Sequence, residues 1–350
     1  MEPQDFTRRL LRWSADAGRR HLPWQQDPTP YRVWVSEIML QQTQVNTVIP
    51  FYQRFMARFP DVPSLASAPV DEVLHLWTGL GYYARARNLH SAAKMIMQGH
   101  AGVFPGSLDQ LRELPGIGRS TAGAILALSR GQRDAILDGN VKRVLSRVFG
   151  IEGDPSKAGT LDRLWQQAEQ CTPTSQVAEY TQGIMDLGAM VCTRSRPRCS
   201  SCPMNPGCIA ARDGRQADLP SPRRPRERPS REVTLLLAES RAQGIRAVLL
   251  ERRAESGVWG GLWSPPQFEN REAALAWCRR ELGEPASLPE PLPPIDHAFT
   301  HFDLRLHPLR VRCNLVARVD EGTHLWYTLA TPPRIGLPKP IKTLMERLED

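Results

Sequence analysis

The stretch Leu114-Pro115-Gly116-Ile117-Gly118 decides the fold class, because it joins two segments that carry helical signatures. Upstream, Ser107 and Gln110 have the spacing of a capping box at the start of a short helix. Downstream, residues 121–129 form an alanine-rich run that suits a closely packed helix. The glycines Gly116 and Gly118 permit a tight backbone approach, and N–H groups at the start of the second helix can bind a phosphate. The stretch therefore predicts a helical hairpin with a phosphate-binding turn.

A single aspartate follows this hairpin at a short distance. Asp138 lies 20 residues after Gly118, in the sequence Leu137-Asp138-Gly139-Asn140-Val141. An aspartate before a Gly-Asn turn commonly caps the next helix. A carboxylate here could equally serve catalysis, and the spacing alone leaves both interpretations open.

A second carboxylate stands alone in an apolar helical pattern. Glu37 lies within Trp34-Val35-Ser36-Glu37-Ile38-Met39-Leu40, where nearly all its neighbours are apolar. Such surroundings raise the pKa of a glutamate and keep it protonated as a general acid. An exposed, solvated glutamate is the alternative. The wider pattern over residues 33–56 predicts one long helix that Pro50 ends or kinks.

Four of the seven cysteines are clustered, which favours a metal site in a reducing compartment over a disulfide framework. Cys192, Cys199, Cys202 and Cys208 follow the spacing C-x6-C-x2-C-x5-C. Four thiolates so close in sequence can enclose one tetrahedral or cubane centre. A zinc ribbon usually has two C-x2-C pairs, and this loop has one, so the spacing disfavours zinc without excluding it. The other cysteines, isolated in the sequence, are expected to be buried apolar thiols.

Length and charge set the wider limits. A chain of 350 residues is long enough for two or three domains. Its formal net charge of +8 suggests a polyanionic partner, although an ordinary basic protein would carry the same charge. No apolar run approaches the roughly 18 residues of a membrane span, and the charged, amphipathic N-terminus does not resemble a signal peptide. We expect a cytoplasmic protein.

The composition and the hydrophobic pattern of the sequence change at two points. Residues 1–212 have mostly helical patterns, and residues 213–231 form a linker in which prolines alternate with arginines. Residues 232–350 have an α+β pattern. In this last part we expect strands over 233–238 and 245–250 joined at Gln243-Gly244, a helix over 272–282, strands over 304–316, and a helix over 341–348.

These motifs together resemble one family. The hairpin with its aspartate and the cysteine spacing resemble the endonuclease III superfamily of helix-hairpin-helix DNA glycosylases. Residues 36–45 resemble the S-E-x-M-L-Q-Q-T-x-V signature of its MutY-type adenine DNA glycosylases. The resemblance implies a mostly α N-terminal glycosylase domain with an iron–sulfur cluster loop, and an α+β Nudix-like C-terminal domain. It also implies base excision repair of adenine paired with 8-oxoguanine or guanine in double-stranded DNA.

The resemblance assigns roles to the chemical groups. Glu37 would protonate the departing adenine, Asp138 would stabilise or capture the oxocarbenium-like sugar, and Asn140 would orient the site. The four clustered cysteines would hold a [4Fe–4S] cluster. Strand-cleaving relatives carry a lysine where this chain has Ser120, and a hydroxyl cannot form their Schiff base. The resemblance therefore implies base removal without strong lyase activity, although Lys142 could trap a product adventitiously.

It also assigns the contacts with DNA. Because the target base must leave the stack, Gln42 would intercalate and Tyr82 would wedge beside the opposite base. Arginines at 85 and 87 favour a DNA-facing loop around Tyr82. The hairpin glycines, Ser120 and Lys142 would also lie at the DNA. The adenine pocket would comprise Arg20, Leu22, Trp24 and Gln182.

The C-terminal part resembles a Nudix domain that has lost its catalytic box. Residues Ala276, Trp277, Arg280 and Glu281 align with the box positions R, E, E and E, so one carboxylate remains where magnesium needs three. Phe299-Thr300-His301 resembles the family's F-S-H loop that reads 8-oxoguanine, with threonine in place of serine. Phe299 would support the loop, and the other two residues would contact the purine or a phosphate.

Three other functions remain open. They are a thymine or uracil mismatch glycosylase of the same superfamily, a non-catalytic DNA-damage-binding protein, and a nucleotide pyrophosphatase. Ser120 and the extra domain disfavour the first, the two carboxylates disfavour the second, and the missing glutamates disfavour the third. We expect a monomer that is associated with the nucleoid.

Overall fold

A computed structural model describes residues 1–221, 227–242, 245–313 and 322–349. The chain divides into two compact units, of which the first comprises Met1–Ser67 and Asn88–Pro225. The second comprises Ala68–Arg87 and Arg226–Asp350. Among the described residues, no helix combines the length and apolar character needed to cross a membrane.

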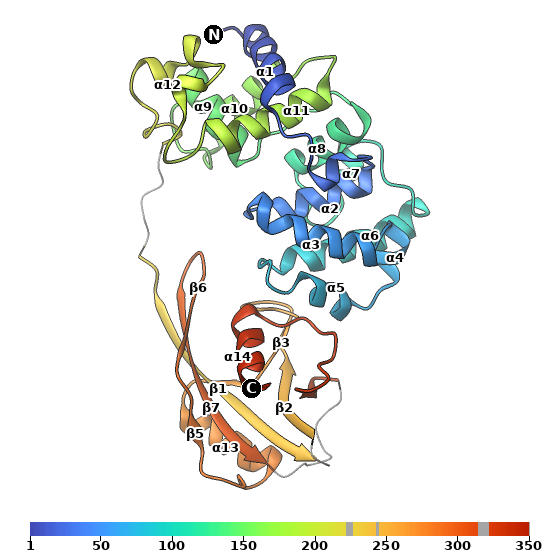
Figure 1. The fold of residues 1–350 in the computed structure, drawn as a ribbon, viewed down its shortest axis with the longest axis vertical. Helices are drawn as coiled ribbons and strands as arrows, with labels where there is room; N and C mark the ends of the chain where they lie inside the picture. The colour runs from blue at the N-terminus through green and yellow to red at the C-terminus, as the bar shows by residue number, and fades with distance from the viewer. Residues whose placement is uncertain (222–226, 243–244, 314–321, 350) are drawn as a thin grey trace. The chain divides into compact units, whose positions relative to one another are not determined.

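The first unit is helical (Figure 1). Its longer helices are α1 (Pro3–Ala17), α2 (Pro30–Leu40), α3 (Val45–Arg58), α6 (Ala84–His100), α8 (Arg119–Arg130), α9 (Gly139–Phe149), α10 (Ala158–Cys171) and α11 (Val177–Asp186). Shorter ones are η1 (Pro23–Gln25), α4 (Val62–Ser67), α7 (Leu108–Arg112), the π-helical turn η2 (Leu187–Val191), η3 (Cys199–Ser201), η4 (Asn205–Gly207) and α12 (Ile209–Arg212). α6 begins in the second unit and continues into this one. One core packs α1 against α9, α10 and α11, through residues such as Phe6, Leu145 and Leu164.

The expected helical hairpin is present as α7 and α8. The Ser107 side chain accepts a hydrogen bond from the Gln110 N–H, and Gly118 caps α8 at its N-terminus. Gly116 has φ 80°, and a Cβ atom there would lie 3.0 Å from the Cβ of Asn88. The turn therefore needs glycine at this position for both conformation and space.

The single helix expected over residues 33–56 is wrong. The structure has two helices, α2 and α3, separated at Gln41–Gln44, and Pro50 lies inside α3 without ending it. The break occurs where Gln42 adopts a left-handed backbone with φ 58°. Pro50 is close to the start of α3, so it removes one backbone hydrogen bond there and the helix continues.

In its described residues, the second unit is built on an eight-stranded sheet. Its strands are β1 (Ser230–Ala242), β2 (Ile245–Arg252), β3 (Trp263–Ser264), β4 (Gln267–Phe268), β5 (Glu290–Pro291), β6 (Ile295–Ala298), β7 (Asp303–Cys313) and β8 (His324–Thr328). β1 runs parallel to β7 and antiparallel to β2. Helix α13 (Arg271–Leu282) packs on β1, and α14 (Lys339–Glu349) ends the chain. These elements confirm the expected α+β texture; the expected turn at 243–244 and the continuation beyond Cys313 fall outside the described residues.

An early segment of the chain belongs to this second unit. Helix α5 (Val70–Trp77) and the loop after it pack with C-terminal residues. Asp71 accepts hydrogen bonds from the Trp263 indole at 3.1 Å and from Arg252 at 3.1 Å, and the Tyr83 hydroxyl donates to the Leu337 carbonyl at 3.0 Å. The sequence pattern suggests one continuous domain over residues 1–212. In the structure, residues 68–87 of that range fold with the second unit instead.

Candidate active site

Glu37 lies on α2 among buried apolar residues. Its neighbours Val33, Trp34 and Ile38 are almost fully buried, while part of the Glu37 side chain stays accessible. Burial, and then the negative charge of Asp138, raise the pKa of Glu37 to about 8. The carboxyl is therefore protonated at neutral pH and can donate a proton, as the sequence predicts.

Asp138 is both a helix cap and a member of the site. One of its oxygens accepts from the Val141 N–H at 2.8 Å, and the other accepts from the Asn140 side-chain amide at 3.2 Å. Burial raises the pKa of Asp138, and these donors together with Arg143 oppose that rise. The helix-cap interpretation is thus confirmed. The negative charge of Asp138 also raises the pKa of Glu37, so the two carboxyls interact electrostatically.

Ser120 supports the segment that carries Asp138. Its hydroxyl accepts a hydrogen bond from the Leu137 N–H at 2.9 Å. The first turn of α8 is thereby tied to the residue before Asp138. Lys142 lies half-buried in the first turn of α9, four residues after Asp138.

A cavity of about 550 Å³ opens beside α2. It is large enough for a purine ring. Its lining includes Arg20, Trp24 and Gln182, as expected, together with Ser36, which precedes Glu37. Leu22 is buried nearby and is not among the lining residues. The Trp24 ring is fixed from behind by an edge contact with Tyr52, whose ring centroid lies 5.4 Å away.

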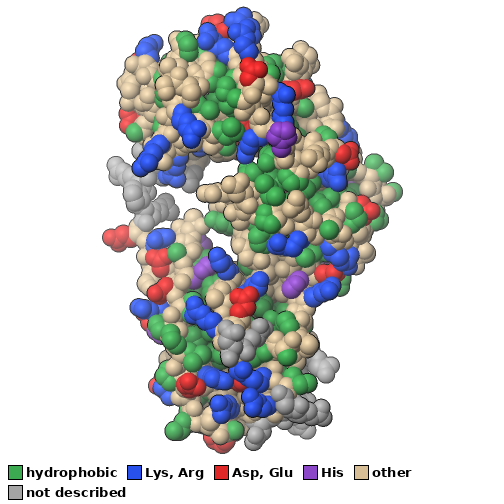
Figure 2. Space-filling model, in the orientation of Figure 1, with side chains coloured by type: hydrophobic (Ala, Val, Ile, Leu, Met, Phe, Trp, Pro, Cys, Tyr) green, Lys and Arg blue, Asp and Glu red, His purple; other side chains and the backbone are tan. Residues whose placement is uncertain are grey.

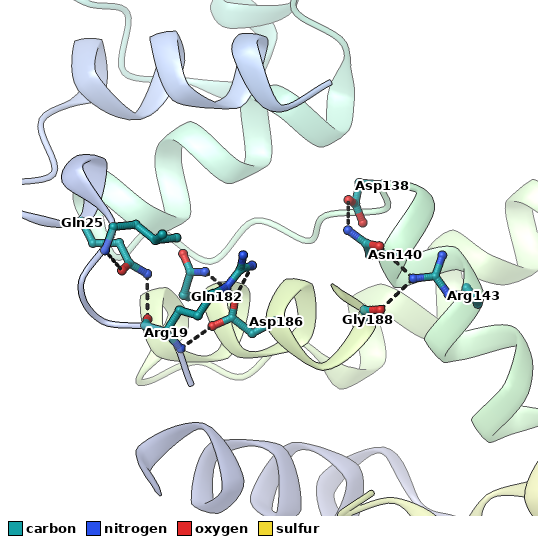
Figure 3. A network of polar contacts seen from close by, with 9 residues as sticks. Arg19, Gln25, Asp138, Asn140, Arg143, Gln182, Asp186 and Gly188 are labelled. Atoms are coloured by element: carbon teal, nitrogen blue, oxygen red, sulfur yellow. Dashed lines mark hydrogen bonds and ion pairs between the residues drawn. The ribbon is translucent and has the colours of Figure 1, made fainter. Parts of the chain in front are cut away.

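Asp186, which the motifs did not reveal, lies behind this pocket and binds two of its lining residues, Arg19 and Gln182. It is fully buried and accepts from the Arg19 backbone and guanidinium at 2.7 Å each, and from the Gln182 amide nitrogen at 2.9 Å (Figure 3). A carboxylate can only accept, so it turns the Gln182 nitrogen toward itself and leaves the amide oxygen for another donor. In the sequence, the four-residue spacing of Gln182 and Asp186, which places them on one helical face, could have indicated this contact.

A second chain of contacts runs from Asp138 toward the cysteine loop (Figure 3). Arg143 donates to the Asn140 side-chain oxygen at 2.8 Å, to the Gly188 carbonyl at 2.8 Å and to the Cys192 carbonyl at 2.7 Å. Gly188 lies in η2, and a Cβ atom there would lie 2.6 Å from the Cβ of Asn140. π-helical turns of this kind occur frequently at functional sites.

The four clustered cysteines line one small cavity. The buried Arg147 donates to the Cys192 sulfur at 3.4 Å and to the Thr193 and Arg194 carbonyls, and Gln216 donates to the Cys199 sulfur at 3.7 Å. Burial raises the pKa of Cys202 to about 11, as do the neighbouring cysteines. In the part of the chain that the structure describes, no three His, Cys, Asp or Glu side chains converge as they would around a single metal ion.

The two expected DNA-inserting residues share an unusual backbone. Gln42 has φ 58° and is exposed, and Tyr82 has φ 49° with 48% of its surface exposed. Left-handed conformations of non-glycine residues gather at binding sites, where the surrounding structure maintains them. The two arginines from which we expected a DNA-facing loop make contacts within the protein. Arg85 is buried against the Tyr82 and Trp77 rings, and Arg87 binds backbone carbonyls.

The expected lesion-reading residues form the tip of the β6–β7 hairpin. The Phe299 N–H donates to the Phe302 carbonyl at 2.9 Å, and the two phenylalanine rings stack 4.6 Å apart. Thr300 and His301 are exposed at the tip. The Tyr82 hydroxyl lies 3.4 Å from the Thr300 hydroxyl, so two residues far apart in sequence come together within the second unit.

The surface is rich in cations. Figure 2 shows lysine and arginine side chains spread over the visible face of the first unit, in keeping with the net charge of +8. Such a surface suits a phosphate backbone.

The fold and these sites define a base excision DNA repair protein of the HhH-GPD superfamily, whose family model matches residues 35–170. A NUDIX domain model matches residues 238–347. Among solved structures, a thermostable thymine-DNA glycosylase aligns over 60% of this chain and 97% of its own, with a TM-score of 0.55 and 26% identity. An endonuclease III–DNA complex aligns over 61% of this chain and 98% of its own, with a TM-score of 0.52 and 21% identity, and so shows the same fold.

Curated relatives narrow the assignment. An adenine DNA glycosylase of Buchnera aphidicola (strain APS) is 37% identical, covering 98% of this chain and 97% of its own length. The adenine DNA glycosylase of Homo sapiens is 36% identical, covering 85% of this chain and 65% of its own length. The chain belongs to the adenine DNA glycosylase family. It is a DNA N-glycosylase of base excision repair.

Proposed function

We propose that this enzyme hydrolyses the N-glycosidic bond of adenine paired with 8-oxoguanine or guanine in double-stranded DNA, and that it leaves the strand intact. The observation that supports this most is a buried Glu37 with a raised pKa, beside Asp138 and next to a purine-sized cavity. Protonated Glu37 donates to N7 of the adenine. The bond between the sugar C1′ and adenine N9 then breaks, and its electron pair leaves with the neutral base.

Asp138 acts on the sugar that remains. Its anionic form stabilises the oxocarbenium-like centre or captures it as an ester at C1′. Water then adds at C1′, which breaks any bond to Asp138 and frees its carboxylate, and the water loses a proton to the Glu37 carboxylate. The Asn140 and Val141 donors hold the Asp138 oxygens in place during this step. The same donors favour the charged form that the step needs.

Gln182 accounts for adenine as the substrate. The side-chain nitrogen of Gln182 donates a hydrogen bond to Asp186. The side-chain oxygen of Gln182 can therefore accept a hydrogen bond from the exocyclic amine of a base. Adenine carries such an amine, whereas thymine and uracil carry a carbonyl oxygen there. A site built around an acceptor strongly rejects a base that cannot donate to it.

Hydrolysis without lyase activity follows from Ser120. The residue offers a hydroxyl that already holds the Leu137 backbone, and a Schiff base needs an amine. Lys142 is half-buried near Asp138, so we assign to it only the adventitious trapping of the product.

Cys192, Cys199, Cys202 and Cys208 would hold a [4Fe–4S] cluster. The four cysteines line one cavity. Their spacing contains one C-x2-C pair, whereas a zinc ribbon usually has two, so this donor set fits a cubane better than zinc. When bound, the cluster would supply a redox-capable centre that braces the loop. Arg147 and Gln216 would donate hydrogen bonds to its cysteine sulfurs.

Recognition of the opposite base belongs to the hairpin tip. The target adenine is an undamaged base, so its partner must supply the information that it is misplaced. Thr300 and His301 are exposed polar groups on a rigid aromatic base, and Tyr82 stands beside them. We assign to these residues the contacts with 8-oxoguanine. We further propose that the enzyme acts as a monomer in the cytoplasm, associated with the nucleoid.

A single-turnover assay tests this function. Duplexes that carry A, T or U opposite G or 8-oxoguanine are incubated with excess enzyme, and strand scission is scored with and without alkali. We expect release of adenine alone, fastest opposite 8-oxoguanine, with strands that break only after alkali. Release of thymine or uracil at comparable rates would refute the substrate assignment, and scission without alkali in the Lys142→Ala variant would refute the hydrolytic one.

A further inference from the structure

A turn in the second unit, Gly257–Leu262, has an unusual conformation. Trp259 adopts φ 57° although it carries a large side chain, and it is 93% buried, with 7% of its surface exposed. A left-handed backbone at a bulky residue is strained and persists only where other contacts impose it. The contacts that impose it are therefore informative.

The neighbouring glycines leave the turn little freedom. A Cβ atom on Gly260 would lie 2.1 Å from the Glu255 carbonyl oxygen, and Gly261 has φ 74°. The Gly261 N–H donates to the Arg253 carbonyl at 3.1 Å, and the Leu262 N–H donates to the Trp259 carbonyl at 3.0 Å. The backbone thus forms a closed turn that directs the Trp259 ring inward.

Arg87, which is distant from this turn in the sequence, forms hydrogen bonds with its backbone. Its guanidinium donates to the Gly260 carbonyl and, at 3.2 Å, to the Glu255 carbonyl. Arg87 follows Tyr82 by five residues within the same segment of the second unit. One side chain therefore connects the Tyr82 loop to the Trp259 turn.

The Trp259 ring reaches the base of the reading hairpin. Its centroid lies 5.8 Å from that of Phe299 and 5.9 Å from that of His297, and Phe299 stacks on Phe302. Thr300 and His301 project from this aromatic group. Displacing Trp259 would remove the surface against which Phe299 rests, and small displacements of a binding group cost affinity.

We propose that Arg87 and Trp259 are positioning residues for the opposite-base reader. Arg87 fixes the turn, and the turn presents Trp259 to Phe299; the same arginine fixes the end of the segment that carries Tyr82. Arg87 thereby fixes the position of Tyr82 relative to the hairpin tip that carries Thr300 and His301. This inference rests on the proposed role of Thr300, His301 and Tyr82 in reading 8-oxoguanine.

The test uses the full-length holoenzyme and compares single-turnover adenine release from A:8-oxoguanine and A:G duplexes at one salt concentration. Trp259→Ala and Arg87→Ala should lower the ratio of the two rate constants on the order of tenfold, as for one lost hydrogen-bonded contact. Trp259→Phe keeps a ring and should retain most of the preference. Arg87→Lys can reach one carbonyl at a time and should give an intermediate ratio.

Trp277→Ala is the matched control. Trp277 is a half-buried tryptophan of the same unit that packs on Phe268 and His324. Its loss should lower the melting temperature and leave the ratio unchanged. If Trp259→Ala and Arg87→Ala behave like this control, they act on stability alone and the inference is wrong. Should both alanine variants fail to fold, a wild-type ratio in Arg87→Lys would overturn it, because that variant is expected to lose part of the preference.

A double-mutant cycle separates this inference from the proposed function. Thr300→Ala/His301→Ala removes the reader itself, and an unchanged ratio in that variant would refute the reader. If it lowers the ratio, adding Trp259→Ala should lower the ratio no further, because nothing is left to position. Fully additive losses would show that Trp259 acts independently and would contradict the inference alone.

Discussion

At the scale of single residues, the surroundings of Glu37 and Asp138 decide which carboxyl holds a proton. Burial raises the pKa of both, but Asp138 accepts hydrogen bonds from Asn140 and Val141, while apolar side chains surround Glu37. Their mutual repulsion further favours a single negative charge in the site. Environments that separate two pKa values assign the acid and the base.

This assignment predicts the pH dependence of adenine release. The single-turnover rate should fall as the pH rises through about 8, because Glu37 then loses the proton that it must donate. It should also fall on the acid side, as Asp138 becomes protonated. A rate that stays level from pH 7 to 9.5 would contradict the acid role of Glu37.

The raised pKa of Glu37 also makes the stability of the fold depend on pH. The folded-state pKa of Glu37 is raised above the unfolded value, so its contribution is full below the model-peptide pKa of 4.5 and is lost as the pH rises through about 8. Glu37→Gln should therefore gain melting temperature over the wild type at pH 9, and the gain should vanish at pH 4. Differential scanning calorimetry at both pH values measures it.

Asp186 tests the pocket. Asp186→Asn places an N–H donor among donors from Arg19 and Gln182, and breaking a buried pair costs about 3 kcal/mol. We expect lower stability in urea and slower adenine release. The control is Asp5→Asn, which loses only surface pairs with Arg8 and Arg9 and should change stability little. Equal losses of stability and of adenine release in the two variants would show that Asp186 contributes no more than a surface aspartate does.

At the scale of elements, α9 connects the catalytic aspartate to the cysteine loop. Asp138 caps α9, Arg143 bonds from its second turn to η2 and Cys192, and Arg147 lies one turn later at the cysteines. The helix that Asp138 caps thus carries two successive arginines that bind the loop and the turn before it. Damage to the loop should reach Asp138 through this helix.

Arg143→Lys tests this connection. A lysine keeps the charge but cannot donate to Asn140, Gly188 and Cys192 in the fixed geometry of a guanidinium. We expect adenine release to fall on the order of tenfold while duplex affinity stays within a factor of about two. A parallel loss of affinity would instead place Arg143 at the DNA.

Local chemistry explains what the sequence could predict. Glu37, Asp138 and the four cysteines were found because an apolar neighbourhood, a turn and a spacing are visible over a few residues. Asp186, Arg87 and Trp259 were missed because their roles depend on contacts with distant parts of the chain. The end of α2 was placed wrongly because nothing in the sequence marks Gln42 as left-handed, whereas Pro50 attracted the prediction.

At the scale of the whole molecule, the residues that we propose for catalysis and those that we propose for recognition lie in different compact units. Glu37 and Asp138 belong to the first, and Tyr82, Thr300 and His301 belong to the second. Because residues 68–87 fold with the C-terminal part, deleting residues 226–350 would also remove the surroundings of Tyr82. Point variants in the full chain therefore separate the two tasks more cleanly than a truncation.

The cysteine loop makes a prediction for the whole protein. Anaerobically purified enzyme should be brown and contain about four iron atoms per chain. Cys199→Ser should lower the iron content, and Cys171→Ser, which changes a buried cysteine outside the loop, should not. Stoichiometric zinc with no iron would overturn the cluster assignment.

The central claim is that Glu37 and Asp138 together break the bond to adenine. The most direct measurement is the single-turnover rate of adenine release from an A:8-oxoguanine duplex by Glu37→Gln, taken together with its affinity for that duplex. Glutamine keeps the size of the side chain and removes the proton to be donated. The account predicts near-wild-type affinity with no measurable release. Release at close to the wild-type rate, with binding intact, would contradict it.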